Sequence, residues 1–290
     1  MLRRDMERYV ALQRASGFVF DEQARVLESY VTFAASAGDI FVRTARVLAW
    51  SRRAASAQQR RTLLLTVRRF ALALTAEDPR HEVPSPDLLP RAKRVRQQPY
   101  IYSAAEIEAL VNCAGEVATR GCPVAGLYPT LFGLLAVTGM RISEALALDM
   151  GDIMADGIVI RQAKRKGRRL LPLHPTTSRA LERYLIARRD VDAGCDAVFL
   201  ADRGGRLSYG AVLGVFKRMR EKTGLAHAAK GGRHPRIHDL RHSFAVRSLE
   251  ACSPDRRVIA RHMVGLSTYL GHVRCPPVGC RPASDETGVR

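Results

Sequence analysis

The sequence predicts a mainly α-helical protein that carries a small β-hairpin and is divided into two domains. Three observations lead to this prediction. Residues 4 to 75 show apolar side chains at helical spacing almost throughout. Residues 79 to 99 are rich in proline, which interrupts helices. Two short aliphatic runs flank a basic turn near residue 165, as in a hairpin.

The charge of the chain favours a polyanionic partner. Its 290 residues include 47 Lys and Arg against 28 Asp and Glu, a formal net charge of +19. A nucleic-acid duplex presents a continuous line of phosphates, so a surplus of this size favours nucleic acid over a small acidic metabolite. A basic but otherwise ordinary soluble protein is the alternative.

The sequence indicates neither a membrane segment nor a metal site. No apolar run is long enough to span a bilayer, and the first residues lack the apolar block of a signal peptide, so we expect a cytoplasmic protein. The six cysteines are scattered, and we expect reduced thiols. Cys275, Cys280 and His272 do not have the spacing of a zinc knuckle, so no metal is expected.

The N-terminal part is expected to form a helical bundle with a basic flank. Helices are predicted at about residues 4–15, 22–37, 44–55 and 57–75. Thr44 and Ser56 are the predicted N-caps of the last two. Residues 79–99 then combine five prolines with Arg91, Lys93, Arg94 and Arg96, which predicts an extended basic linker.

The second domain begins with well-marked helices. Ser103 and Glu106 form a capping box for a helix over about 104–114. A second helix, over about 127–137, stops at Gly139, where a glycine permits a left-handed turn, and a new helix begins at once. Arg141 lies at that new N-terminus, which suits a cation only if it faces an anion. A surface pair with Glu144 is the alternative, and the two are compatible.

A β-section and a further helix follow. Strands are predicted at 157–160 and 169–173, around a basic tip at 163–168. Such a tip is usually a solvated loop, but it can also offer a lysine to a phosphodiester. A short strand is expected at 198–200 and a helix at about 208–223, capped by Ser208.

The helix that begins near Arg236 carries the strongest candidate site. His238, Arg241 and His242 fall on one face, three and four positions apart, beside an apolar stripe. An imidazole and a guanidinium held together suit a phosphate, although a solvated face is the commoner explanation for such a trio. Another helical stretch precedes the run from Leu266 to His272.

Three ordered motifs resemble those of the tyrosine recombinases, also called phage integrases. The run from Thr138 to Leu146 is similar to that family's first arginine motif. The run from His238 to Phe244 is similar to its His-x-x-Arg motif, and Leu270-Gly271-His272 to its final Leu-Gly-His. The resemblance implies a helical core-binding (SAM-like) domain at residues 1–78, the linker at 79–99, a catalytic domain at 100–273 and an aberrant tail at 274–290.

The resemblance also implies a chemistry. In this family a tyrosine attacks a phosphodiester of double-stranded DNA, and a DNA hydroxyl later displaces it, without a metal or nucleotide cofactor. Arg141 and Arg241 would neutralise the nonbridging oxygens. Lys164, matched through the run Arg169–Leu173, would protonate the leaving oxygen, with Lys166 as the competing candidate. His238 would assist proton transfer, and His272 would hydrogen-bond the phosphate.

The tail departs from the family pattern. The nucleophilic tyrosine of the family follows the Gly-His by roughly two to three helical turns, whereas residues 273–290 contain no tyrosine. Pro276 and Pro277 also oppose a helix there. We expect a truncated or out-of-frame ending, no covalent intermediate and a weakened homo-oligomer on DNA. Tyr269, which precedes the motif, is interpreted as a packing residue.

The sequence therefore leads to one main hypothesis about function and one alternative. The main hypothesis is a site-specific DNA recombinase or integrase of the tyrosine recombinase family, catalytically impaired in this chain. The alternative is a non-catalytic, sequence-specific DNA-binding protein or regulator. Replacement of Arg141 and Arg241 separates a regulator unrelated to recombination from the other readings, because such a regulator would lose little binding at any one phosphodiester. The absent tyrosine favours a non-catalytic DNA-binding remnant over an active recombinase for this chain.

Overall fold

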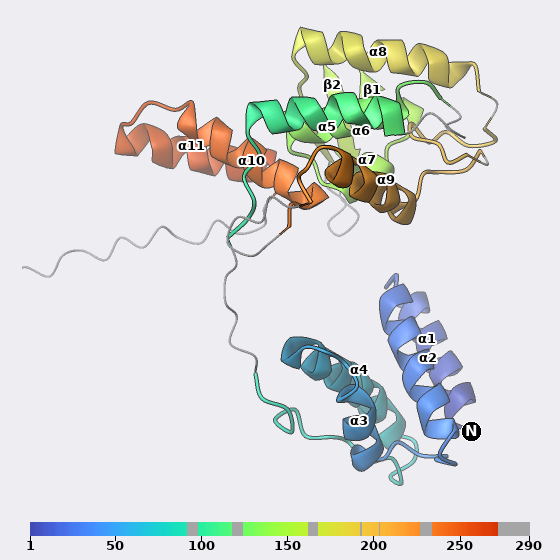
Figure 1. The fold of residues 1–290 in the computed structure, drawn as a ribbon. Helices are drawn as coiled ribbons and strands as arrows, with labels where there is room; N and C mark the ends of the chain where they lie inside the picture. Colours follow the sequence, from blue (N-terminus) through green and yellow to red (C-terminus); the bar gives the residue numbers. More distant parts are fainter. Residues whose placement is uncertain are drawn as a thin grey trace, which may run out of the picture. The chain divides into compact units, whose positions relative to one another are not determined.

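A computed structural model of the chain describes residues 1–91, 98–117, 124–161, 168–191, 193–202, 204–226 and 234–271. The chain forms two compact units, unit 1 over Met1–Arg96 and unit 2 over Gln97–Arg290 (Figure 1). The boundary between them lies in the segment that the sequence predicts to be a linker. The predicted fold class, mainly helical with one small sheet, is confirmed.

Unit 1 is a bundle of four helices. They are α1 (Leu2–Ala15), α2 (Asp21–Ala35), α3 (Thr44–Ser51) and α4 (Ala57–Thr75). Tyr30, Leu64 and Phe70 are fully buried at its centre, which shows that the apolar spacing in the sequence marks the core. The four predicted helices are confirmed, although α3 ends four residues earlier than expected.

One of the two predicted caps in unit 1 is correct. The Ser56 hydroxyl accepts a hydrogen bond from the Gln59 N–H, at 3.1 Å. Thr44 is not a cap but the first residue of α3, and its N–H donates to the Glu82 carboxylate at 2.8 Å. A carboxylate distant in sequence therefore does what a local hydroxyl was expected to do.

Part of the proline-rich segment packs onto unit 1. Arg61 donates to the carbonyls of Pro86 and Leu89, and Arg68 donates to the carbonyl of Pro84. The side chain of Leu89 is buried against the bundle. These carbonyls lie outside helices and strands, and the two arginines of α4 supply their hydrogen-bond donors and fix this stretch of chain.

Unit 2 is built around the apolar helix α6 (Leu127–Thr138), which packs against α5, α8 and α10. Its sheet has three antiparallel strands in the order β1 (Ile153–Met154), β2 (Gly157–Arg161) and β3 (Arg168–Leu171). The other helices are α5 (Ala104–Val117), α7 (Ile142–Leu146), α8 (Pro175–Arg189), α9 (Tyr209–Lys222), α10 (Ile237–Glu250) and α11 (Arg256–Tyr269), and a 3-10 turn, η1, spans Met150–Asp152.

Most predicted elements of unit 2 are present. The capping box is formed, because the Glu106 carboxylate accepts the Ser103 N–H and the Ser103 hydroxyl accepts the Glu106 N–H. Ser208 caps α9 as predicted. The predicted strand at 198–200 is wrong: this buried run forms only isolated bridges. Helix α8 and strand β1 were not predicted.

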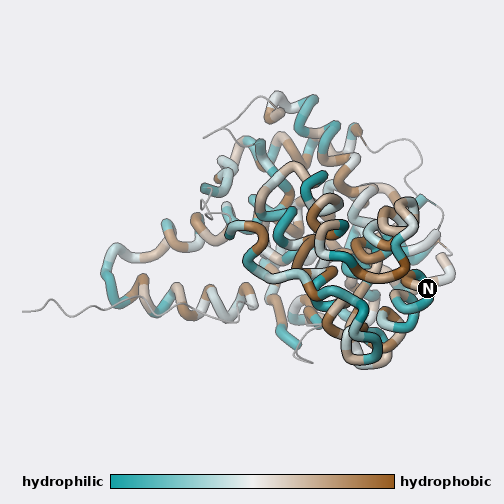
Figure 2. Tube along the Cα trace, turned by 90° about the horizontal axis from the view of Figure 1, so that it is seen from below, coloured by the Kyte–Doolittle hydropathy of each residue, from teal (hydrophilic) through white to brown (hydrophobic). Residues whose placement is uncertain are grey.

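Helices α10 and α11 form a hairpin that extends from the rest of unit 2 (Figure 2). The Ser248 hydroxyl and the His262 ring, 2.9 Å apart, join the two helices. The first turns of α10 are buried against α6, while α11 has no buried residue along Arg256–Tyr269. Among the described residues, no helix combines the length and apolarity that a membrane crossing requires.

Candidate functional site

The site is organised by the break between α6 and α7. Gly139 ends α6 in the left-handed conformation, with φ of 61°, as the sequence predicts. The Thr138 hydroxyl accepts the Met140 N–H at 3.3 Å and steadies the turn. Arg141 is then the N-cap of α7, with extended backbone. The abrupt turn projects the Arg141 side chain from a helix N-terminus.

Arg141 is held by the pair that its spacing predicts. The Glu144 carboxylate accepts the Arg141 backbone N–H at 2.8 Å and its Nη1 at 2.7 Å. The same carboxylate accepts both terminal nitrogens of Arg169 from β3, at 3.1 and 2.7 Å. Burial opposes ionisation of Glu144, but the hydrogen bonds from Arg169 and Arg141 outweigh it and lower its pKa. Glu144 is therefore a carboxylate clamp between two guanidinium groups.

Arg241 is buried, not solvated. Only 4% of the residue is exposed. Its Nη1 donates to the carbonyl of Gly139 at 2.7 Å, and its Nη2 to the carbonyl of Leu270 at 2.5 Å. Burial lowers the pKa of Arg241 to about 10, and the nearby charge of Arg141 adds to the effect. The alternative of a solvated helix face is thus wrong for Arg241.

The two arginines converge on the turn that follows α11. Arg241 binds the Leu270 carbonyl, and Nη2 of Arg141 lies 3.4 Å from the carbonyl of the next residue, Gly271. Counting Arg169 and Glu144, the cluster carries three positive charges and one negative. A net positive, partly desolvated cluster at a helix N-terminus is suited to bind an oxyanion such as a phosphodiester.

Two histidines stand beside this cluster on α10. The rings of His238 and His242 are 4.9 Å apart between centroids and nearly perpendicular, at 88°. The pKa of His238 is lowered by burial first, then by His242 and by Arg241. Burial likewise lowers the pKa of His242. Both rings are therefore neutral near pH 7 and can accept a proton from a hydroxyl group or donate a hydrogen bond to a bound oxyanion.

A buried network that the sequence does not reveal ties α10 to the start of unit 2. The Ser243 hydroxyl accepts the Tyr102 N–H at 2.8 Å and donates to the Asp239 carbonyl at 2.9 Å. The Tyr102 hydroxyl donates to the Arg236 carbonyl at 3.0 Å. These bonds fix the helix that carries His238 and Arg241. Because Tyr102 is more than 130 positions from Arg236 and Ser243, no local spacing in the sequence indicates them.

Several predicted residues lie outside the described part of the chain. Lys164, its competitor Lys166, and His272 all do, as do Cys275 and Cys280. Tyr269 is described, and its ring stacks on that of Phe244, with centroids 5.7 Å apart and planes at 25°. Burial raises the pKa of Tyr269. These contacts fit the interpretation of Tyr269 as a packing residue.

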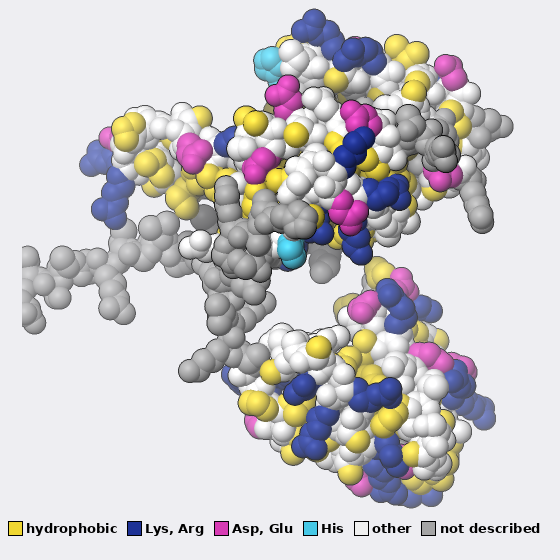
Figure 3. Space-filling model, in the orientation of Figure 1, with side chains coloured by type: hydrophobic (Ala, Val, Ile, Leu, Met, Phe, Trp, Pro, Cys, Tyr) yellow, Lys and Arg dark blue, Asp and Glu magenta, His cyan; other side chains and the backbone are white. Residues whose placement is uncertain are grey.

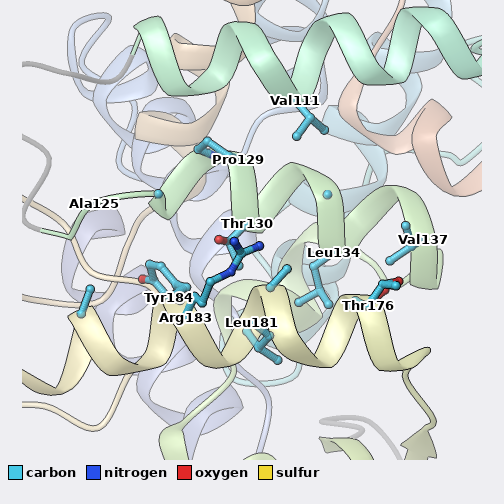
Figure 4. Close-up of a pocket in the computed structure, with 15 residues that line it drawn as sticks. Val111, Ala125, Pro129, Thr130, Leu134, Val137, Thr176, Leu181, Arg183 and Tyr184 are labelled. Atoms are coloured by element: carbon cyan, nitrogen blue, oxygen red, sulfur yellow. The ribbon is translucent and has the colours of Figure 1, made fainter.

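A separate groove lies between α5, α6 and α8, with a volume of about 610 Å³ (Figure 4). Its walls are mostly apolar, from residues such as Val111, Leu134 and Leu181, and Arg183 of α8 points toward Thr130 of α6. None of the residues of the arginine cluster lines it. The groove is therefore distinct from the candidate anion site.

Lys and Arg side chains are exposed on the visible face of each unit (Figure 3).

Comparisons with known proteins identify a family that this chain matches. Residues 103–265 match the family model described as the phage integrase family. A Sinorhizobium fredii protein named as an integrase/recombinase, y4rB, is 36% identical over 282 residues, which cover 93% of this chain and 89% of that protein. The tyrosine recombinase XerC of Actinobacillus pleuropneumoniae is 39% identical over 127 residues, 43% of this chain and 39% of that protein.

Solved structures share the fold. A lambda integrase tetramer bound to a Holliday junction superposes with a TM-score of 0.62 at 18% identity, covering 96% of this chain and 80% of that one. A lambda integrase dimer bound to a COC′ core site gives a TM-score of 0.62 at 19% identity, covering 94% and 95%.

Proposed function

Because this chain belongs to the phage integrase family, we propose that it is a site-specific DNA recombinase that binds duplex DNA and holds one phosphodiester for strand cleavage and exchange. The observation that carries this proposal is the convergence of Arg141 and Arg241 on the Leu270–Gly271 turn. Two guanidinium groups so placed can each direct N–H donors at one phosphate, where charge builds during cleavage.

The roles of the site residues follow from this arrangement and from the family. Arg141 and Arg241 bind the nonbridging oxygens of the phosphate. His238, neutral beside Arg241, moves a proton during cleavage. Lys164 protonates the leaving oxygen and His272 hydrogen-bonds the phosphate, both assigned through their family motifs.

Both units contact the DNA. Residues 1–78 form the core-binding domain, 79–99 the linker, 100–273 the catalytic domain and 274–290 a tail. Both units carry excess positive charge for phosphate contacts outside the scissile position. The lambda integrase structures that share this fold hold DNA as dimers and tetramers, which supports duplex DNA as the substrate and self-association on it.

The first experiment is a phosphate scan. The DNA site is selected from a random duplex library with the purified chain, and each phosphate is then ethylated in turn to find those required for binding. In the wild type we expect strong interference at one phosphate in each half-site, and its loss in the Arg141→Ala/Arg241→Ala variant. Interference that is identical in both proteins would overturn the proposal. The Arg179→Ala/Arg183→Ala variant of α8 removes the same charge elsewhere and serves as the control.

A second candidate function is DNA binding without cleavage. Residues 272–290 contain no tyrosine. A chain with this sequence can occupy a recombination site and grip its phosphate without forming a phosphotyrosyl link. Occupancy without cleavage on a nicked duplex distinguishes this function from strand exchange.

A further inference from the structure

We propose that Arg169 is a positioning residue of the phosphate site, which acts through Glu144 to fix the Arg141 guanidinium and to keep its positive charge available to the phosphate. The inference rests on the proposed function, because it concerns the same site. It adds a residue from the sheet to a site whose other described members come from α7 and α10.

The exposure of the two arginines distinguishes their tasks. The Arg141 side chain is 35% exposed, whereas that of Arg169 is 11% exposed and that of Glu144 is 12% exposed. Arg169 thus lies behind the carboxylate and Arg141 in front of it. An incoming phosphate meets Arg141, while Arg169 is enclosed by protein.

The hydrogen bonds leave the carboxylate no freedom. Oε1 of Glu144 accepts from Nη1 of Arg141 and Nη1 of Arg169. Its Oε2 accepts from the Arg141 backbone N–H and from Nη2 of Arg169. The Arg169 fork binds the carboxylate in the bidentate geometry that a guanidinium alone provides. With the plane of the carboxylate fixed, the direction of the Arg141 guanidinium is fixed as well.

Charge gives the second half of the argument. Glu144 and Arg141 by themselves form a neutral pair, which attracts a phosphate weakly. Arg169 gives the group of Arg141, Glu144 and Arg169 a net charge of +1. It also shares the Glu144 carboxylate, which would otherwise pair with Arg141 alone. The positive charges of Arg141 and Arg169 both lower the pKa of buried Arg241, so the three arginines interact electrostatically.

The location of Arg169 also links the strands to the site. It pairs with Ile160 across β2 and β3, and it directly follows the basic run 163–168 that contains Lys164. The bonds to Glu144 therefore join the base of this hairpin to the N-terminal turn of α7. A single ion-pair network connects β3 to the helix N-terminus that presents Arg141.

The test measures how strongly each variant distinguishes a charged phosphate from a neutral one. Binding is measured for the selected duplex and for the same duplex with one methylphosphonate at the phosphate assigned to Arg141 and Arg241. Wild-type protein should prefer the native duplex by about tenfold or more, as for charge-assisted hydrogen bonds. Arg169→Gln should reduce this preference to less than about threefold and leave affinity for the methylphosphonate duplex unchanged.

Matched variants separate positioning from general effects. Arg179→Gln removes the same charge from an exposed position of α8, outside the site, and should retain the wild-type preference. Arg169→Lys, which keeps the charge but not the bidentate fork, should give an intermediate preference and retains a readout if Arg169→Gln fails to fold. The Glu144→Gln/Arg169→Gln variant should show the same preference as Glu144→Gln.

Each other outcome has a defined meaning. A wild-type preference in Arg169→Gln or in Arg169→Lys overturns the inference, as does an equal loss of affinity for both duplexes. A further loss in the double variant would mean that Arg169 touches the phosphate directly, which also overturns it. If the wild-type protein itself shows no preference at any phosphate, the proposed function fails instead, so the two failures are distinguishable.

Discussion

Gly139 lies directly against the ring of Phe244. A Cβ atom added to Gly139 would be 2.5 Å from Cδ1 of Phe244, and the glycine has φ of +61°. Its carbonyl is also the acceptor for Nη1 of Arg241. Three requirements therefore meet at one residue: a left-handed turn, close packing and an arginine anchor.

Gly139→Ala is expected to destabilise unit 2 by about 2 kcal/mol or more, because the side chain is strained by the left-handed backbone and overlaps Phe244. Gly133→Ala is the control: it lies within α6, where a Cβ would meet nothing within 4 Å. The control should be stabilised by about 0.5–1 kcal/mol. Denaturant unfolding measures both, and equal effects would show that the turn at Gly139 is unconstrained.

Glu144→Gln is expected to lower stability by about 2–4 kcal/mol, since the neutral amide leaves two partly buried guanidinium groups without a countercharge. Glu108→Gln removes a carboxylate from the exposed face of α5 and should change stability by less than about 0.5 kcal/mol. Thermal unfolding at low ionic strength gives the comparison. A Glu144→Gln protein as stable as the control would mean that the clamp contributes nothing to folding.

Unit 2 should lose stability as the pH falls through about 6.5, the ordinary pKa of histidine. Burial lowers the pKa of both His238 and His242 in the folded chain, so the unfolded chain binds more protons in the window just below that pH. The unfolding free energy therefore decreases as the pH falls. His238→Gln should reduce this slope, as measured by urea unfolding between about pH 5 and pH 8. An unchanged slope contradicts the assignment of His238 as a ring that the folded chain keeps neutral.

Ser243→Ala is expected to cost about 1–3 kcal/mol, because the buried N–H of Tyr102 loses its acceptor. The hydroxyl is fully buried, so water cannot replace it. Ser178→Ala, at a partly exposed position of α8, is the control and should be nearly neutral. Hydrogen exchange at Tyr102 provides an independent readout, since its amide should lose protection only in Ser243→Ala.

The 290-residue chain should bind a nicked suicide duplex without forming a covalent adduct. Residues 272–290 supply no phenol, and the ring of Tyr269 is engaged in stacking on Phe244. Denaturing electrophoresis after incubation with labelled DNA detects any adduct. If one is found, Tyr269→Phe identifies whether Tyr269 is its source, and the interpretation of that residue as a packing group is wrong.

Local patterns in the sequence predict the features that depend on neighbours three or four residues away. The Ser103–Glu106 capping box, the Ser208 cap and the Arg141–Glu144 pair are of this kind, and all are present. The glycine stop at Gly139 is equally local. Short-range geometry leaves a readable spacing, so these elements could be derived from the sequence.

Features that depend on distant backbone could not be derived. The acceptors of Arg241 are two carbonyl groups, which every residue possesses, so no residue type marks them. The run Ala197–Leu200 has the composition of a strand but is buried with isolated bridges only. Helix α8 was missed although Pro175 at its first turn and the His174 cap offered a signal.

The bonds from the arginines to the turn after α11 also determine when the site can form. Arg241 bonds to a carbonyl 102 residues earlier, and Arg141 lies near one 130 residues later. Contacts of such long sequence separation form late in folding, since the loops they close are entropically costly. During synthesis, the oxyanion site therefore cannot form until Leu270 and Gly271 have left the ribosome. A shorter nascent chain cannot bind a DNA phosphate at this site.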